Sequence, residues 1–253
     1  MRIGAGPFDL STISGGALRA AAEQAAAAAF DSVWVAERRT SGAGGALAAA
    51  TMVAQWTPVR VGAVVGIGAY HPLHLAEDIA VADVATGGRL EVVLRPAHDD
   101  PDVIKEHLHV LSAALAGAHV QWEGLHLRIP ARLADNGFVP QRLAVSPPPM
   151  QPAVPAWFLD ADEVLGAHAS RLGFGTAAAF QAGSPVPPTW SRLPGLVMCR
   201  GHVEPEQLLA AAGDGSAYFL VAVETADDVR LTGRRLVGPL RMPEFPDWVH
   251  GER

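Results

Sequence analysis

The chain has 253 residues, a net charge of −7 and a pI of about 5.8, which suits one domain with a large core and leaves no basic footprint for nucleic acid. Its single cysteine, Cys199, excludes an internal disulfide and fits a reducing cytosol. The first residues lack a charged and apolar leader pattern, and no apolar run reaches the roughly 18 residues of a membrane span. We therefore expect a soluble, cytoplasmic protein that binds neither nucleic acid nor membrane.

The first part of the chain alternates between strand and helix patterns. A short strand is predicted at Arg2–Gly6, before Pro7-Phe8-Asp9. Alanine-rich residues 17–29 favour a helix by propensity. A second strand is predicted at Phe30–Ala36 and a second helix at Gly45–Trp56.

A strand, helix and strand follow in close succession. Val59–Ile67 is apolar on both faces, which is typical of a strand covered on both sides in a parallel sheet. Pro72–Thr86 carries one apolar stripe, and Pro72 stands near the first turn, where its missing N–H costs little. Gly87-Gly88 ends this helix, and Leu90–Leu94 supplies the next buried strand. The segment predicts a right-handed βαβ unit.

Proline divides the rest of the chain. Six prolines between residues 131 and 155 exclude a helix or central strand there, and four more lie between residues 181 and 194. The remaining predicted elements are a helix at 99–116, a hairpin at 119–129, strands at 156–159, 173–180, 195–200 and 217–223, and helices at 162–172, 205–212 and 225–237.

The run from residue 71 to 94, HPLHLAEDIAVADVATGGRLEVVL, resembles a segment of the bacterial luciferase-like monooxygenases, which commonly reads HP-x-x-LAE-x-x-A-x-x-D-x-x-S/T-GGRLE. The residues at 30–37, the Trp122-x-Gly124 element with Pro130, and Pro239–Arg241 resemble other parts of that family. The resemblance implies a (β/α)₈ barrel that uses a flavin or deazaflavin, FMN or F420. Family members are usually longer, so we expect one shortened barrel domain over residues 1–253, with at least one helix replaced by a Pro-rich loop.

In such a barrel the site is assembled from the carboxyl ends of the strands and the loops that follow them. The predicted strands therefore select these candidates: Phe8, Asp9, Glu37, Arg38, Arg39, residues 66–71, Arg95, His98, Asp160, Phe180, Gln181, Arg200, His202 and Glu224.

Three of these residues are candidates for a catalytic role. Glu37-Arg38-Arg39 stands where many relatives carry Glu-His-His, and one of those histidines belongs to the family's active site. Arginine stays charged and does not replace histidine as an acid or base, but it binds phosphate or carboxylate; the alternative is a solvated basic turn. His71 is a candidate polar group beside the cofactor ring, or a residue that caps the following helix.

The resemblance also implies a cofactor-binding set: Phe8, Gly66, Ile67, Gly68, Ala69 and Arg95. In the family, the stretch that matches Gly66–Ala69 lies close beneath the isoalloxazine ring and often contains a non-prolyl cis peptide. Glycine permits such a close approach, although a plain turn explains the same residues.

Two departures count against ordinary cofactor binding. Arg95-Pro96 replaces a glycine-rich segment after the fourth strand, and Asp160 with Asp162 would repel a phosphate dianion after the fifth. The sequence contains no motif with metal-ligand spacing, so a metal site is not expected, and it lacks the Gly-x-Ser-x-Gly motif of a hydrolase. Cys199 lies within a predicted buried strand and is expected to act as a small apolar side chain and not as a nucleophile.

Two functions remain open at the level of sequence. The first is a flavin- or deazaflavin-dependent oxidoreductase or monooxygenase that acts on a small organic substrate. The second is a non-catalytic barrel that has lost cofactor binding and acts as a ligand-binding or partner subunit. The family forms homodimers and unequal pairs, so we expect a homodimer or pairing with a homologous subunit.

Overall fold

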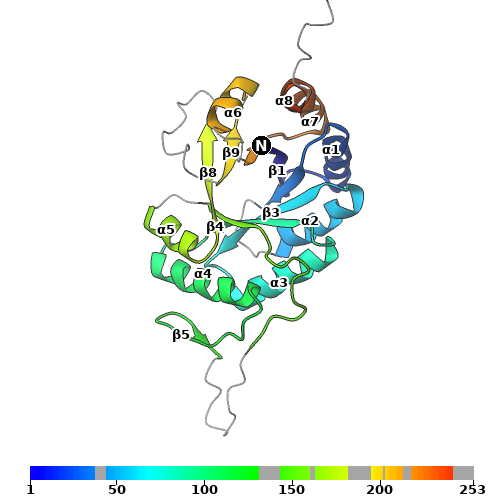
Figure 1. The fold of residues 1–253 in the computed structure, drawn as a ribbon. Coiled ribbons are helices and arrows are strands. Elements are labelled where there is room, and N and C mark those ends of the chain that lie inside the picture. The colour runs from blue at the N-terminus through cyan, green and yellow to red at the C-terminus, as the bar shows by residue number, and fades with distance from the viewer. Residues whose placement is uncertain are drawn as a thin grey trace, which may run out of the picture.

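Eight parallel strands close into a barrel in the computed structural model, which describes residues 1–37, 44–130, 143–159, 163–181, 195–201, 203–212 and 218–241 (Figure 1). Neighbouring strands around the barrel follow the order β1-β10-β9-β8-β7-β4-β3-β2. The strands are β1 (Arg2–Asp9), β2 (Ser32–Ala36), β3 (Arg60–Ile67), β4 (Leu90–Pro96), β7 (Ala156–Leu159), β8 (Gly175–Gln181), β9 (Gly195–Arg200) and β10 (Tyr218–Val221). The predicted (β/α)₈ fold is confirmed.

Helices alternate with these strands and cover the outside of the barrel (Figure 1). They are α1 (Gly15–Ala27), α2 (Gly44–Trp56), α3 (Pro72–Ala85), α4 (Pro101–Leu115), α5 (Glu163–Arg171), α6 (Pro205–Ala212), α7 (Ala226–Thr232), the π-helical turn η2 (Gly233–Val237) and α8 (Gly238–Arg241). Side-chain caps begin several of them, as the sequence favours: Ser14 accepts from the N–H of Ala17, and Asp100 accepts from that of Asp102. The helix expected to be missing falls on residues 182–194, which lie outside the described residues.

Two elements extend beyond their predicted ends. The strand predicted at Arg2–Gly6 continues to Asp9, because a register shift between Ala5 and Phe8 accommodates Pro7, which has no N–H for the ladder. The last helix continues from Val237 into α8, which contains Pro239.

Side chains on the strands form two apolar layers. Those that point outward pack under the helices in the larger cluster. Those that point into the barrel form a second cluster, which consists of Trp34, Val64, Val93, Ala177, Leu196, Tyr218 and Leu220. Because side chains alternate along a strand, this inner set shows which residues face the barrel interior.

Glu91 holds together the amino ends of the strands. Its carboxylate is fully buried, and it accepts hydrogen bonds from Arg2 and Arg60 at 2.6 Å each. The Tyr218 hydroxyl donates to its other oxygen at 2.6 Å. Burial and then the Glu91 charge raise the pKa of Tyr218, so the phenol stays protonated and continues to donate. Glu91 thus joins β1, β3, β4 and β10 from inside the barrel.

Arg89 and Asp83, which also belong to the sequence motif, stabilise the same end of the barrel from outside. The Arg89 guanidinium donates to the carbonyl oxygens of Ala54, Thr57, Val59 and Thr86 at 2.7–2.9 Å. The buried Asp83 carboxylate accepts from both the main-chain and the side-chain N–H of Gln151, at 2.8 and 2.7 Å. These bonds anchor the Pro-rich segment before β7 against α3.

The predicted hairpin is confirmed as β5 (Trp122–Glu123) paired with β6 (Arg128–Ile129). It lies outside the barrel near α4 (Figure 1). Glu106 on α4 accepts from the N–H groups of Leu125 and Leu127 at 2.6 and 2.9 Å, and from that of His126. One carboxylate therefore fixes the turn of the hairpin to the helix. Among the helices of the described residues, none has the length and apolar character needed to cross a membrane.

Replacement of Glu91 by glutamine is expected to lower the free energy of unfolding by about 3 kcal/mol, because it leaves two guanidinium groups at the barrel end without their buried anion. Urea denaturation measures the change. Glu23→Gln, which breaks the exposed Arg19–Glu23 pair on α1, is the control and is expected to cost about 0.5 kcal/mol or less. Equal effects of the two substitutions would contradict the role assigned to Glu91.

The buried His107 on α4 is expected to make stability depend on pH. Its Nδ1 has no hydrogen-bond partner among the described residues, and burial, followed by the nearby His71 and His98, lowers its pKa from 6.5 to about 4. The folded state therefore resists protonation, so stability is complete above pH 6.5 and is lost as the pH falls towards 4. Urea denaturation at about pH 7 and about pH 5 should show a smaller loss in His107→Leu than in the natural chain. An unchanged loss would assign the effect to other groups.

Candidate functional site

The carboxyl ends of the strands form the open end of the barrel, where inward side chains are only partly covered. By alternation from the inner cluster, Ala36, Gly66, Arg95, Leu159 and Met198 point into this end, and all five are partly exposed. We call these five residues the barrel mouth. These five residues combine an apolar floor, one glycine and one guanidinium. The sequence candidate Arg200, two residues after Met198 on β9, lies on the same face of its strand and is exposed.

Arg95 lies across the end of β3. It pairs with Gly66 in the β3–β4 ladder, and its Nη2 donates to the carbonyl oxygen of Glu37, after β2, at 3.2 Å. The guanidinium therefore reaches from β4 to β2 across the end of β3, where Gly66 has no side chain. Among the described residues, no carboxylate forms an ion pair with Arg95. Arg95 thus presents a positive charge to the mouth, and its partner among the described residues is the neutral carbonyl of Glu37. This arrangement favours an anionic ligand group.

The Glu37 side chain turns away from the mouth towards the start of α2. A Cβ built on Gly45 would lie 2.6 Å from Glu37 Oε2, so the carboxylate rests against the first turn of this helix. A negative charge is stabilised there by the helix dipole. The carboxylate of Glu37 therefore lies beside the start of α2, whereas its main-chain carbonyl accepts the hydrogen bond from Arg95. Arg38, the other catalytic candidate of this segment, lies outside the described residues together with Arg39.

The Gly66–Ala69 stretch only partly reaches the mouth. Gly66 faces it, whereas the Ile67 side chain is fully buried in the outer layer. Gly68 has a φ of +102°, and a Cβ there would meet Ile104 and His98, so this glycine serves close packing between loops. Ala69 is exposed. The cis peptide bonds among the described residues all precede proline, so the non-prolyl cis peptide implied at 66–69 is not present.

Phe8 also faces away from the mouth. The register shift between Ala5 and Phe8 turns it to the outer layer, where it is 1% exposed. Of the expected cofactor-binding set, the structure brings Gly66 and Arg95 together and places Phe8 and Ile67 under the helices.

His71 caps α3. Its Nδ1 accepts a hydrogen bond from the N–H of Leu73 at 3.3 Å, and its ring centroid lies 5.4 Å from that of His74. Burial, followed by the charge of His74, lowers its pKa and so favours the neutral ring, which has one nitrogen able to accept. The structure thus supports the helix-capping alternative for this residue.

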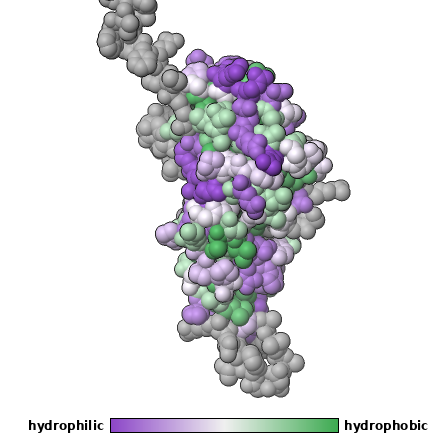
Figure 2. Space-filling model, turned by 90° about the vertical axis from the view of Figure 1, so that its right-hand side faces the viewer, coloured by the Kyte–Doolittle hydropathy of each residue, from purple (hydrophilic) through white to green (hydrophobic). Residues whose placement is uncertain are grey.

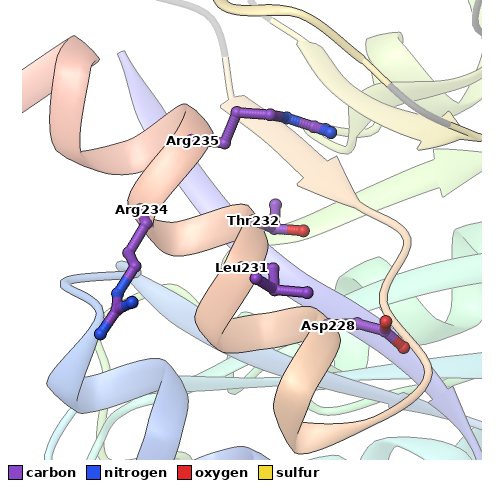
Figure 3. Close-up of a pocket in the computed structure, with 5 residues that line it drawn as sticks. All are labelled: Asp228, Leu231, Thr232, Arg234 and Arg235. Carbon is purple, nitrogen blue, oxygen red and sulfur yellow. The ribbon is translucent and has the colours of Figure 1, made fainter.

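A second hollow opens beside β9 and β10. It has a volume of about 280 Å³ and is lined by Gly201, Val221, Ala222, Val223, Glu224, Asp228, Thr232 and Arg235. A neighbouring hollow of about 520 Å³ shares three of these residues and adds Leu231 and Arg234 (Figure 3). Only Glu224 was a sequence candidate. No motif marks Thr232 or Arg235, which lie on the helical segment after the last strand.

Cys199 is buried away from this site. Cys199 is 2% exposed, and burial raises its pKa to about 12, as expected for an apolar filler. Within the described ranges, no group of three or more His, Cys, Asp or Glu side chains could hold a metal ion.

The barrel mouth fits one part of a flavin-type cofactor. Partly exposed Ala36, Leu159 and Met198 offer apolar surface to a flat ring, and Gly66 leaves room beside them. Arg95 supplies a cation for the electron-rich edge of such a ring. Arg95 also reaches from β4 to the Glu37 carbonyl after β2, so a ring that lies across the mouth would have to accommodate the guanidinium.

Comparison with known proteins gives the family. The model of the luciferase-like monooxygenase family matches residues 5–159. A search of curated proteins finds no match.

Solved structures share the fold at low sequence identity. Monooxygenase RslO1 from Streptomyces bottropensis superposes with a TM-score of 0.70 at 17% identity, over 95% of this chain and 100% of that one. The coenzyme F420 dependent tetrahydromethanopterin reductase from Methanopyrus kandleri gives 0.65 at 12% identity, over 94% of this chain and 98% of that one. The oxygenating constituent of 3,6-diketocamphane monooxygenase from Pseudomonas putida, in complex with FMN, gives 0.53 at 17% identity, over 78% and 66%. With the family model covering more than half of its residues, this chain belongs to the luciferase-like monooxygenase family.

Proposed function

We propose that the protein is a flavin- or deazaflavin-dependent oxidoreductase that acts on a small organic substrate at the barrel mouth. Family membership supports redox chemistry, and structural neighbours include an F420-dependent reductase and an FMN complex. The observation that carries the proposal is Arg95, a mouth-facing cation set beside Gly66 and an apolar floor. A bound FMN or F420 would supply the electron transfer, which no side chain of the mouth provides.

The residues of the chain would bind and orient. Arg95 would hold negative charge in the mouth, and its bond to the Glu37 carbonyl keeps the guanidinium on the β2–β4 side. Ala36, Leu159 and Met198 would exclude water from the floor. The Glu37 carboxylate lies beside the first turn of α2, and His71 caps the start of α3.

A non-catalytic barrel is the second candidate, and the same residue favours it. The Arg95 side chain reaches across the mouth to the Glu37 carbonyl, and the family's glycine-rich segment after the fourth strand is replaced by Arg95-Pro96. If the guanidinium keeps this position, it fills space that a ring would need, and the chain would serve as a ligand-binding or partner subunit.

Titration of the purified protein with FMN and with F420, each oxidised and reduced and followed by fluorescence, separates the two candidates. We expect saturable micromolar binding of one of them, and binding about tenfold weaker in Arg95→Met, which loses a charge-assisted contact. Arg19→Met, which removes a surface arginine on α1, is the control and should bind like the natural chain. No binding of either cofactor at about 100 μM would reject the oxidoreductase and leave the non-catalytic barrel.

We further propose that two copies of the chain pair through α2 and α3. Helix α2 has no charged residue, and Met52, Val81 and Val84 on these two helices are 50%, 51% and 45% exposed. Figure 2, which views the side that carries α1 to α3 in Figure 1, shows apolar surface gathered on this face. Two chains of charge −7 repel one another overall, so a face without charge on α2 is a favourable place for contact.

Light scattering after gel filtration is expected to give a dimer for the natural chain and a monomer for Met52→Glu/Val81→Glu, because the substitutions place four carboxylates in the paired face. Val164→Glu, at an exposed apolar position of α5, is the control and should remain dimeric. A natural chain that stays monomeric at micromolar concentration would rule out the homodimer.

A further inference from the structure

Three aromatic rings from three different strands meet inside the barrel. Trp34 on β2, Trp157 on β7 and Tyr218 on β10 each contact the other two. Ring centroids lie 6.2 Å apart for Trp34–Trp157 and for Trp34–Tyr218, and 5.7 Å apart for Trp157–Tyr218, in edge-to-face geometry. We call these three residues the aromatic cluster. Trp34 and Tyr218 are buried, whereas Trp157 is partly exposed.

Glycines on neighbouring strands make room for the two indoles. A Cβ built on Gly62 would clash with the Trp34 ring, and one built on Gly175 would clash with the Trp157 ring. Gly62 pairs with Trp34 in the β2–β3 ladder, and Gly175 pairs with Trp157 in the β7–β8 ladder. Each indole therefore lies over the strand beside its own. The barrel interior is shaped around these rings.

The indoles lie one layer below the floor of the barrel mouth. Trp34 comes two residues before Ala36, and Trp157 comes two residues before Leu159, so each indole shares a strand face with a residue of the floor. Electron exchange between aromatic rings falls steeply with distance and is fast between rings in contact. The aromatic cluster thus forms a short route for electrons between the underside of the mouth and Tyr218.

Tyr218 ends this route at a proton acceptor. Its hydroxyl donates to Glu91 Oε2 at 2.6 Å and accepts from Trp34 Nε1 at 3.0 Å. An oxidised phenol is a strong acid, so it loses an electron easily only where a base takes its proton. Arg2 and Arg60 pair with Glu91 and stabilise it as a carboxylate. Burial and then the Glu91 charge raise the pKa of Tyr218, so the phenol keeps its proton until it is oxidised.

We propose that the aromatic cluster carries a one-electron oxidising equivalent from beneath the barrel mouth to Tyr218, whose phenolic proton passes to Glu91. An oxygen radical or a photo-excited oxidised flavin takes one electron from the partly exposed Trp157, which becomes an indole radical cation in exchange with Trp34. Tyr218 gives one electron to the indole and one proton to Glu91, which leaves a neutral tyrosyl radical beside a neutral carboxylic acid. A thiolate in solution then gives one electron and becomes a thiyl radical, while Glu91 returns the proton to the phenoxyl oxygen.

The route protects the barrel mouth from oxidation. Met198 in the mouth is partly exposed, and oxidation to the sulfoxide would make this apolar side chain polar. The chain belongs to a monooxygenase family, so an oxidant derived from oxygen at the mouth is the source that the route would drain. Only this source rests on the proposed function. Transfer within the aromatic cluster does not.

Pulse radiolysis with the azide radical, which oxidises tryptophan selectively, tests transfer within the cluster. The chain contains two tyrosines, Tyr70 and Tyr218, so two substitutions assign the radical. We expect the indole radical absorption to decay as the tyrosyl band rises, both in the natural chain and in Tyr70→Phe, and the tyrosyl band to be lost in Tyr218→Phe. Tyr70 is the matched control, because its ring packs on His74 and contacts no indole among the described residues. A band lost with Tyr70, or equal bands in the two variants, would overturn the proposal.

Two further measurements keep the test decisive if Tyr218→Phe does not fold. Trp157→Phe leaves the phenol and Glu91 in place and should slow the tyrosyl rise, whereas Trp122→Phe, which removes an indole of the β5–β6 hairpin, should not. Equal rates in these two variants would overturn the route through Trp157. The rise in the natural chain should also be slower in D₂O, because a proton moves with the electron. An equal rate in the two solvents would overturn the proton step to Glu91.

A laser flash on protein titrated with FMN separates this inference from the proposed function. If FMN binds, the flash should give a tyrosyl radical in the natural chain and none in Tyr218→Phe. If neither FMN nor F420 binds while pulse radiolysis still gives the Tyr218 radical, the cofactor proposal fails and the aromatic route stands. If FMN binds but neither experiment gives a radical on Tyr218, the aromatic route fails and the cofactor proposal stands.

Discussion

The buried carboxylate of Glu91 is the interaction on which the rest of the structure depends. An ionised group in a closed apolar barrel costs several kcal/mol unless it is paired, and Glu91 is paired with Arg2, Arg60 and Tyr218 at once. These partners come from the first residues of their strands, so their bonds set how β1, β3, β4 and β10 meet. The closed end of the barrel is therefore polar at its centre and fixed in register. The open end is left with partly exposed side chains.

Several residues of the family-like motif at 71–94 build this closed end, which explains why the motif predicts the fold. Asp83 anchors the Pro-rich segment, Thr86 and Gly87-Gly88 end α3, Arg89 binds four carbonyl groups, and Glu91 joins the strands. Each position needs one residue type for a geometric reason, so a barrel of this kind can be predicted from these residues. Because they lie away from the carboxyl ends of the strands, the same motif says nothing about chemistry.

The sequence predicted strands from apolar runs, but the direction of single side chains depends on register. Alternation from Val93 places Arg95 in the mouth, and this could be predicted once β4 was located. Phe8 could not be placed, because one irregularity after Ala5 reverses the face that follows it. The same limit applies to Arg235: the residues before it read as an ordinary helix, and only a π-turn turns this arginine, and not Arg234, towards β10. Gly233, the first residue of this turn, packs closely against Ala28 at the end of α1, and local propensity does not reveal such a contact.

Arg95 places positive charge at the open end of a chain with net charge −7. It is oriented by the backbone carbonyl of Glu37, and no ion pair with Arg95 is found among the described residues. A carbonyl fixes a guanidinium in direction but leaves its charge uncancelled, whereas a carboxylate does both. At the closed end of the same barrel, Arg2 and Arg60 are neutralised by Glu91 and serve stability. The contrast in partners, more than the presence of arginine, is what distinguishes groups that hold the fold together from groups able to hold a ligand.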